Sequence, residues 1–108
     1  LCNEAIVGLA TMNYEAWNHR ARLEHLYVDK SVRGQGVGRL LVESALAEAK
    51  AARKRCLWVE TQTINAPAIE FYNHLGFTWC GFDLSLYEPV SVESGEEAIF
   101  FVRDVGLN

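Results

Sequence analysis

The sequence predicts an α/β fold, in which strands and helices alternate along one chain. The first support is the segment Leu23–Val28, where apolar and polar residues alternate as in a half-buried strand. The second is the glycine-rich turn Arg33–Gly38, and the third is the helical spacing of apolar residues from Val37 to Ala49. Good helix formers (Ala, Leu, Glu and Lys) dominate that last segment. A strand, a glycine turn and a helix therefore follow one another at the centre of the predicted fold.

The composition is that of a single globular domain, which we expect to cover residues 1–108. Half of the residues are hydrophobic and 22% are charged, and no apolar run is long enough to span a membrane. The formal charge is −4 and the basic residues form no long patch, so we expect no nucleic-acid partner. The three widely spaced cysteines form no metal motif, and no signal-peptide pattern is seen. We expect a cytoplasmic protein with reduced thiols and no metal.

Two segments precede the glycine turn. Ile6–Thr11 is expected to form a buried strand, because its residues show little alternation. Met12–Arg20 is expected to connect it to the central strand, which we predict at about Arg22–Val28. The aromatic residues beside an acid in this connection suggest part of an acceptor pocket, although packing is the slightly favoured interpretation. A loop is predicted at Asp29–Gln35.

The elements after the turn follow from local signals. A helix is predicted from Val37 to about Arg53, and a second core strand at Cys56–Thr61. Pro67 suits the first turn of a further helix, which we expect to end at Gly76 with a left-handed cap. The strands of a long hairpin are expected within residues 77–87 and 98–105, joined by an acidic loop at 88–97.

The glycine turn also predicts a ligand class. Between a strand and a helix, such a turn exposes backbone N–H groups at the positive end of the helix dipole, which favours a phosphate. The spacing is not that of a dinucleotide-binding fingerprint, because the glycines fall at every second position. It is not a P-loop either, because Arg39-Leu40 follows Gly38 in place of Lys and Ser or Thr. An ordinary strand-to-helix turn remains the alternative.

Two motifs together resemble one family. The pattern Arg33-x-x-Gly36-x-Gly38, after the strand Leu26–Val28, resembles the acetyl-CoA motif of the GNAT superfamily of N-acetyltransferases. Further on, Asn65-Ala66-Pro67-Ala68 leads into Tyr72-Asn73-His74-Leu75-Gly76-Phe77, which resembles the second motif of that family. The resemblance implies an acetyl-CoA-dependent N-acetyltransferase with a GNAT fold, a mixed central sheet flanked by helices. It also implies that the first strand, two helices and most of the second strand of the family are missing, so we expect a homodimer to cover the open surface.

The resemblance further implies roles for individual residues. Tyr72 is implied to protonate the leaving thiolate, and Glu60 or Glu24 to take the proton of the amine. The backbone of Leu26, Tyr27 and Val28 is implied to hold the pantetheine arm and the thioester. Other cofactor contacts are implied for the turn and its arginines and for the second motif, namely Arg33, Gly34, Gln35, Gly36, Val37, Gly38, Arg39, Asn65, Ala68 and Phe71.

A finer resemblance concerns the acceptor. The stretches 14–18, 23–29 and 81–87 resemble the streptothricin acetyltransferase branch, which implies a small cationic amine as substrate. We expect Glu15, Trp17 and Asp83 to bind it, with Glu24 and Glu60 adding negative charge. Two alternatives stay open. One is acetylation of a protein N-terminus, as in the ribosomal-protein acetyltransferases, and the other is a degenerate module that binds CoA without turnover.

Overall fold

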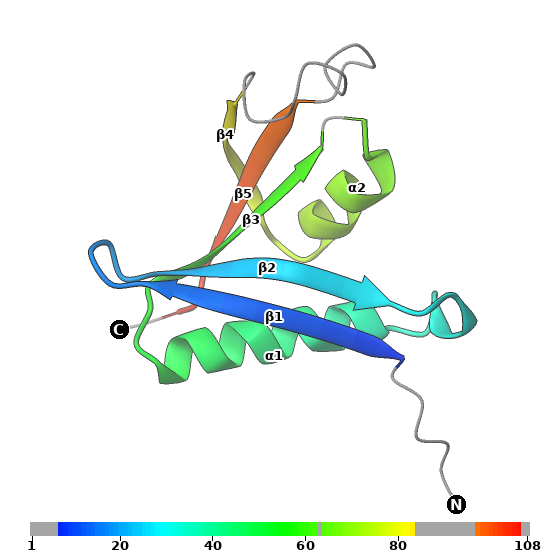
Figure 1. Cartoon of the computed structure of the whole chain (residues 1–108), viewed down its shortest axis with the longest axis horizontal. Coiled ribbons are helices and arrows are strands. Elements are labelled where there is room, and N and C mark those ends of the chain that lie inside the picture. The colour runs from blue at the N-terminus through cyan, green and yellow to red at the C-terminus, as the bar shows by residue number, and fades with distance from the viewer. Residues whose placement is uncertain (1–6, 63, 84–96, 107–108) are drawn as a thin grey trace, which may run out of the picture. The chain divides into compact units, whose positions relative to one another are not determined.

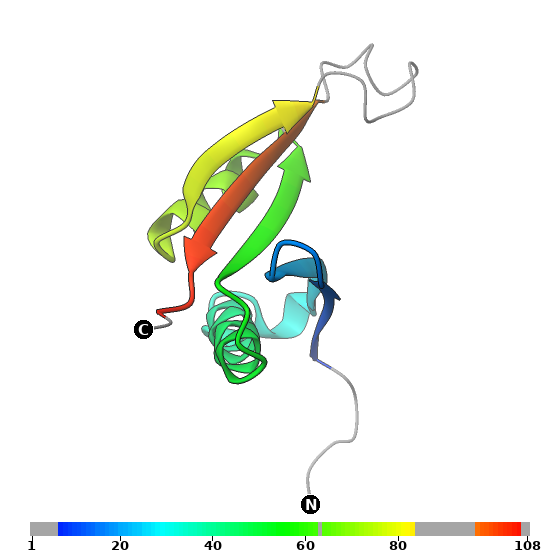
Figure 2. The ribbon, with the colours of Figure 1, turned by 90° about the vertical axis from the view of Figure 1, so that its left-hand side faces the viewer.

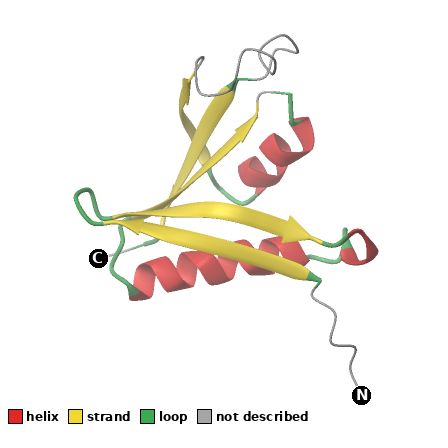
Figure 3. Ribbon diagram, in the orientation of Figure 1, coloured by secondary structure: helices red, strands yellow, loops and turns green. Residues whose placement is uncertain are grey.

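A computed structural model of the chain describes residues 7–62, 64–83 and 97–106. The described residues gather into two compact units, one within Leu1–Leu57 and Val105–Asn108 and the other within Trp58–Asp104. Strands and helices alternate along the chain, as predicted (Figures 1 and 3). In chain order the elements are β1 (Gly8–Glu15), β2 (Arg20–Val28), the 3-10 turn η1 (Lys30–Val32), α1 (Val37–Ala51), β3 (Cys56–Gln62), α2 (Ala66–His74), β4 (Thr78–Asp83) and β5 (Ala98–Asp104).

The first unit is a β-hairpin with a helix against it. Strands β1 and β2 pair antiparallel, from Gly8 opposite Val28 to Glu15 opposite Arg20. Helix α1 runs alongside the hairpin (Figures 1 and 2). A Cβ atom at Gly8 would lie 2.9 Å from Val37 Cγ1, so this glycine allows β1 and α1 to approach closely. The buried face of α1 is small and apolar, consisting of Val42, Ala45, Leu46 and Ala49.

The first strand differs from its prediction in extent and in burial. Strand β1 continues to Glu15, so the connection to β2 is only residues 16–19 and is closed by His19 at φ 54°. None of its residues is buried, and Leu9 is 49% exposed. The reason is that α1 covers only one face of the hairpin. Ile6, the predicted first residue, lies outside the described residues.

The central strand carries a β-bulge that the sequence analysis did not predict. Thr11 pairs with His25 and the next residue, Met12, pairs with Leu23, so Glu24 has no partner on β1. The bulge changes which residues face inward, because Ala21 and Leu23 are buried before it, whereas Glu24 and His25 are both exposed. The predicted regular alternation along Leu23–Val28 was therefore wrong at this point.

The second unit has β5 between β3 and β4, and β4 pairs antiparallel with β5. Helix α2 begins after Asn65, whose side chain accepts a hydrogen bond from the Ala68 amide at 3.2 Å. Gly76 follows the helix at φ 86°, which confirms the predicted left-handed cap. The core of this unit includes Val59, Tyr72, Phe77 and Phe101. The predicted hairpin loop at 88–97 lies outside the described residues, except for Glu97.

Candidate functional site

The glycine turn presents a row of unpaired backbone N–H groups at the start of α1. Gly36 is the N-cap residue at φ 82° and offers no side chain, and the first backbone bond of the helix runs from Leu40 N–H to Gly36 O at 3.0 Å. The first turn of α1 contains no acidic residue. Amides at this end of a helix attract an anion. Within the described part of the chain, the amides without an acceptor here are those of Gly34, Gly36, Val37, Gly38 and Arg39.

Space and positive charge adjoin these amides. A Cβ atom at Gly36 would meet nothing within 4 Å, so the turn is open on that side. Arg33 uses its Nε–H on the carbonyl of Val28 at 3.2 Å, and Arg39 uses its Nε–H on the Glu43 carboxylate, also at 3.2 Å. Since a guanidinium carries five N–H donors, both arginines keep terminal groups that can reach a ligand. The turn can therefore bind a multiply charged anion such as a pyrophosphate.

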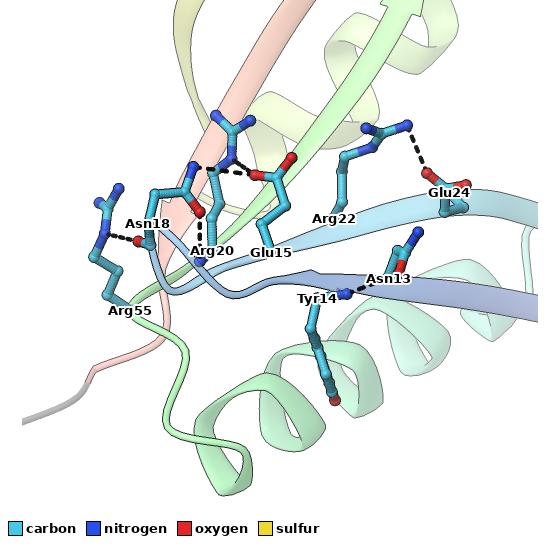
Figure 4. A network of polar contacts seen from close by, with 8 residues as sticks. All are labelled: Asn13, Tyr14, Glu15, Asn18, Arg20, Arg22, Glu24 and Arg55. Carbon is cyan, nitrogen blue, oxygen red and sulfur yellow. Dashed lines mark hydrogen bonds and ion pairs between the residues drawn. The ribbon is translucent and has the colours of Figure 1, made fainter.

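The strand that leads to this turn supplies the predicted backbone segment. Leu26, Tyr27 and Val28 pair on one side with Ala10, Leu9 and Gly8 of β1. The bulge at Glu24 lies just before them, and bulges often occur beside active sites because they redirect a side chain. Glu24 forms an ion pair with Arg22 at 2.7 Å (Figure 4). Two adjacent polar residues, Glu24 and His25, inside an otherwise alternating strand are the sequence signal that indicates this bulge.

The opposite end of the hairpin carries two residues predicted to bind the acceptor. Glu15 accepts hydrogen bonds from Arg20 Nε at 2.8 Å and from Asn18 Nδ2 at 3.1 Å (Figure 4). The bond from Arg20, then that from Asn18, lowers the pKa of Glu15. Arg55 Nε donates to the carbonyl of Asn18 at 2.8 Å, which fixes the turn to the segment after α1. Glu15 is therefore part of a structural network.

Distance separates this end from the glycine turn. A rise of about 3.3 Å per residue places Val28 roughly 26 Å from Arg20 along β2. Trp17, at the hairpin turn, is 84% exposed. Within this unit, the structure does not bring Glu15 and Trp17 together with the glycine turn, and their role in acceptor binding stays a prediction.

Tyr72 lies in an aromatic cluster of the second unit. It is 6% exposed, and its ring contacts Phe71, Phe77 and Phe101 with centroids 5.2, 5.4 and 6.2 Å apart. Burial raises the pKa of Tyr72 to about 12. The phenol is therefore protonated at neutral pH and is held in position by packing, as a hydrogen-bond donor needs to be.

Glu60 lies on the other face of the strands from Tyr72. Successive residues of a strand point to opposite faces, so Phe100 and Phe101 of β5 face opposite ways. Tyr72 contacts Phe101, whereas the ring of Trp58 lies 4.8 Å from that of Phe100. Glu60 follows Trp58 by two residues on β3 and shares its face, and it is half-buried.

The remaining predicted residues of this unit have mixed surroundings. Asn65 is the N-cap of α2, which agrees with the ordinary structural role of an asparagine before a helix. Ala68 donates its amide to that cap, and Phe71 is half-buried against Tyr72. Asp83 ends β4 and is half-buried, opposite Ala98 of β5. Asn65, Ala68, Phe71 and Asp83 thus share a unit with Tyr72 and Glu60, while the glycine turn belongs to the other unit.

The described residues show neither a cluster of metal ligands nor a membrane-spanning helix. No group of three or more His, Cys, Asp or Glu in that part of the chain is arranged to hold a metal ion. None of the helices in it combines the length and apolar character that a membrane crossing requires.

Comparison with known proteins gives consistent matches. Streptothricin acetyltransferase of Streptomyces lavendulae is 39% identical over 95 residues, which are 88% of this chain and 50% of that protein. The [ribosomal protein bS18]-alanine N-acetyltransferase of Escherichia coli K12 is 30% identical, over 81% of this chain and 57% of that protein. A Bacillus anthracis protein, crystallised with acetyl coenzyme A, is 34% identical with a TM-score of 0.86, over 96% of this chain and 59% of that one.

The chain spans about half the length of the curated relatives that it matches. The structural match at a TM-score of 0.86 confirms the predicted fold class, an α/β GNAT fold. The model of the acetyltransferase (GNAT) family matches residues 1–77, which include the glycine turn and the whole of α2. The chain therefore belongs to the GNAT family of acetyltransferases.

Proposed function

We propose that this chain transfers the acetyl group of acetyl-CoA to a primary amine of a small cationic substrate of the streptothricin kind. The observation that carries the proposal is the row of unpaired amides at the start of α1, in a chain of this family. A relative at 34% identity binds acetyl coenzyme A, and one at 39% identity is a streptothricin acetyltransferase. Both the donor and the acceptor are proposals for this chain. Because streptothricin is an antibiotic, resistance to it would follow from its acetylation.

The cofactor is proposed to contact three segments. The amides of the glycine turn, with Arg33 and Arg39, would hold the pyrophosphate, and the backbone of Leu26–Val28 would hold the pantetheine arm. Asn65, Ala68 and Phe71 are proposed to contact the cofactor from α2. When bound, acetyl-CoA supplies the thioester carbonyl that the amine attacks.

The chemical step requires a base and an acid. An alkyl ammonium has a pKa near 10.4, so about one part in a thousand is free amine at neutral pH. We propose that Glu60 removes the proton from the amine, directly or through water, and that the Tyr72 hydroxyl donates to the departing sulfur.

We propose Glu60, which is half-buried on β3, as the base, with Glu24 as the alternative. The carboxylate of Glu24 is 2.7 Å from the guanidinium of Arg22. We propose that Glu24 attracts the cationic acceptor. Asp83 is proposed to assist in that binding.

A second candidate function is acetylation of a protein N-terminus. The observation in its favour is the 30% identity to the ribosomal-protein alanine acetyltransferase. Thiol release from acetyl-CoA distinguishes the candidates when it is measured with streptothricin, with a peptide that begins with alanine, and with no acceptor. Release with streptothricin supports the main proposal and release with the peptide supports the second. A chain that binds CoA and releases thiol with neither would be a binding module.

Replacement of Gly36 by Val is expected to abolish the rise in melting temperature that CoA causes. At φ 82° a β-branched residue is strained, and its side chain would occupy the open space beside the amides. Thermal unfolding with and without CoA measures this, and Gly81→Ala is a matched control in the other unit. Unchanged CoA affinity in a folded Gly36→Val variant would contradict the assignment of the turn.

We also propose that the protein is a cytoplasmic homodimer. The β4 bulge between Trp79 and Gly81 brings the rings of Trp79 and Phe82 together at 6.2 Å, and these side chains are 60% and 58% exposed. An exposed aromatic pair on the outer strand of its unit favours association. Light scattering at working concentration is expected to give twice the mass of the chain. Replacement of Trp79 by Ser is expected to lower the measured mass toward that of one chain. A monomer at all concentrations would refute the dimer.

A further inference from the structure

The segment that leads from β2 to the glycine turn is held by the side chain of Asp29. One carboxylate oxygen accepts from the Tyr27 hydroxyl at 2.9 Å, and the other accepts from the Ser31 amide at 3.0 Å and from the Ser31 hydroxyl. The backbone N–H of Asp29 donates to the carbonyl of Val7 at 2.7 Å. One residue thus joins the end of β2, the start of η1 and the residue that precedes β1.

Polar contacts, and not packing, determine the shape of this segment. The 3-10 turn η1 contains no buried residue, and Tyr27 is 48% exposed. From Asp29 onward a series of tight turns follows, with Val32 N–H on Asp29 O at 3.1 Å and Gln35 N–H on Val32 O at 3.2 Å. The series ends at Gln35, between the unpaired amides of Gly34 and Gly36. The orientation of those amides therefore depends on the conformation that Asp29 imposes.

The choice of a charged residue here needs explanation, because a carboxylate near an anion site repels the anion. The hydrogen bonds of Asp29 explain the choice, because bonds to a charged acceptor are stronger than bonds to a neutral one. The hydroxyl and amide of Ser31 lower the pKa of Asp29, so the side chain is ionised at neutral pH. Arg33 lies close enough to offset part of that negative charge.

We propose that Asp29 is a positioning residue for the phosphate-binding turn: through Ser31 and Tyr27 it orders the segment that aims the unpaired amides at the cofactor. This inference rests on the proposed function and extends it to Asp29 and Ser31, which are not among the proposed cofactor contacts. Because the phosphates of CoA do not react, the loss of Asp29 should weaken donor binding without slowing the chemical step. The effect should also vanish with a donor that has no phosphates.

The test compares Asp29→Asn and Ser31→Ala with Glu48→Gln. Glu48 is exposed on α1, and its change alters the net charge by the same amount as Asp29→Asn. Calorimetry gives Kd for CoA, thermal unfolding gives the stability of the free protein, and turnover is measured with acetyl-CoA and with acetyl-pantetheine. We expect Asp29→Asn to weaken CoA binding about 10- to 100-fold, and Ser31→Ala about 3- to 10-fold, the scale of lost charge-assisted hydrogen bonds.

Three outcomes are informative. KM for acetyl-CoA is expected to rise with kcat nearly unchanged, while turnover with acetyl-pantetheine and the melting temperature of the free protein stay close to those of the native chain. An equal loss with both donors, or an unchanged Kd for CoA in both variants, would overturn the positioning role. A native chain that does not bind CoA would overturn the proposed function as well as this inference. The outcomes named before it would overturn the positioning role alone, so the two failures can be told apart.

Discussion

Replacement of Tyr72 by Phe is expected to lower turnover about 10²- to 10⁴-fold, the scale for a positioned group that donates to charge developing in the transition state. The change removes one oxygen and keeps the ring that contacts Phe71, Phe77 and Phe101. Folding and CoA affinity should change little, because the hydroxyl acts mainly as the thiolate forms. Steady-state kinetics with acetyl-CoA and a good acceptor, together with calorimetry for CoA, separate the two effects.

The pKa of the phenol refines what Tyr72 can do. Burial raises it to about 12, whereas a free thiol has a pKa near 8.5, so complete transfer to the thiolate is uphill by roughly 5 kcal/mol. Tyr72 therefore stabilises the developing sulfur charge chiefly by donating a hydrogen bond. The proton that finally appears on the thiol comes from the solvent or from the amine. The loss in Tyr72→Phe should accordingly appear in kcat and change little between pH 7 and 9.

The same pKa predicts how stability depends on pH. In the unfolded chain a tyrosine ionises near pH 10, but in the folded chain Tyr72 keeps its proton up to about pH 12. The unfolded state therefore binds fewer protons in this interval, and the free energy of unfolding falls as pH rises from about 10 to 12. Tyr72→Phe should lose this component of alkaline sensitivity.

Full activity in Tyr72→Phe would mean that the residue only packs, and the proposed mechanism would be wrong.

The parts of the fold that depend on local chemistry were predicted well. Helix α1 begins at Val37, where the glycine turn ends, and α2 has Asn65 at its N-cap and Gly76 just beyond its end. These signals act within one helical turn, so neighbouring residues suffice to identify them. The glycine turn is of the same kind, since positive φ at Gly34 and Gly36 follows from the residue type.

The parts that depend on pairing between distant residues were predicted less well. The bulge at Glu24 follows from the register between β1 and β2, and register is not a property of either strand alone. The ion pair Glu15–Arg20 joins β1 to β2 and likewise depends on how the hairpin closes, whereas Glu24–Arg22 lies within β2. Glu15 and Glu24, which the sequence presented as acids for a cationic acceptor, thus have arginine partners. Tyr72 as a site residue came from the family resemblance, because its burial alone indicates core packing.

Replacement of Glu60 by Gln is expected to lower turnover about 10²- to 10⁴-fold at pH 7, where the acceptor amine is almost fully protonated. The defining result is the pH dependence. The fraction of free amine rises about tenfold per pH unit up to its pKa near 10.4, so the need for a base declines and the loss in Glu60→Gln should shrink as pH rises. The measurement is kcat/KM for the acceptor in native and variant chains from pH 6 to 9.

Glu24→Gln is the matched control, because it removes the same charge from the other candidate carboxylate, which lies 2.7 Å from the Arg22 guanidinium. If Glu24 contributes only electrostatic attraction, its loss should raise KM for the acceptor more than it lowers kcat, with no change in the pH profile. A role of Glu60 limited to acceptor binding would give that same pattern in Glu60→Gln. A constant loss across the pH range, or a pH-dependent loss in Glu24→Gln alone, would assign the base to another group. The two variants therefore separate proton removal from attraction of a cation.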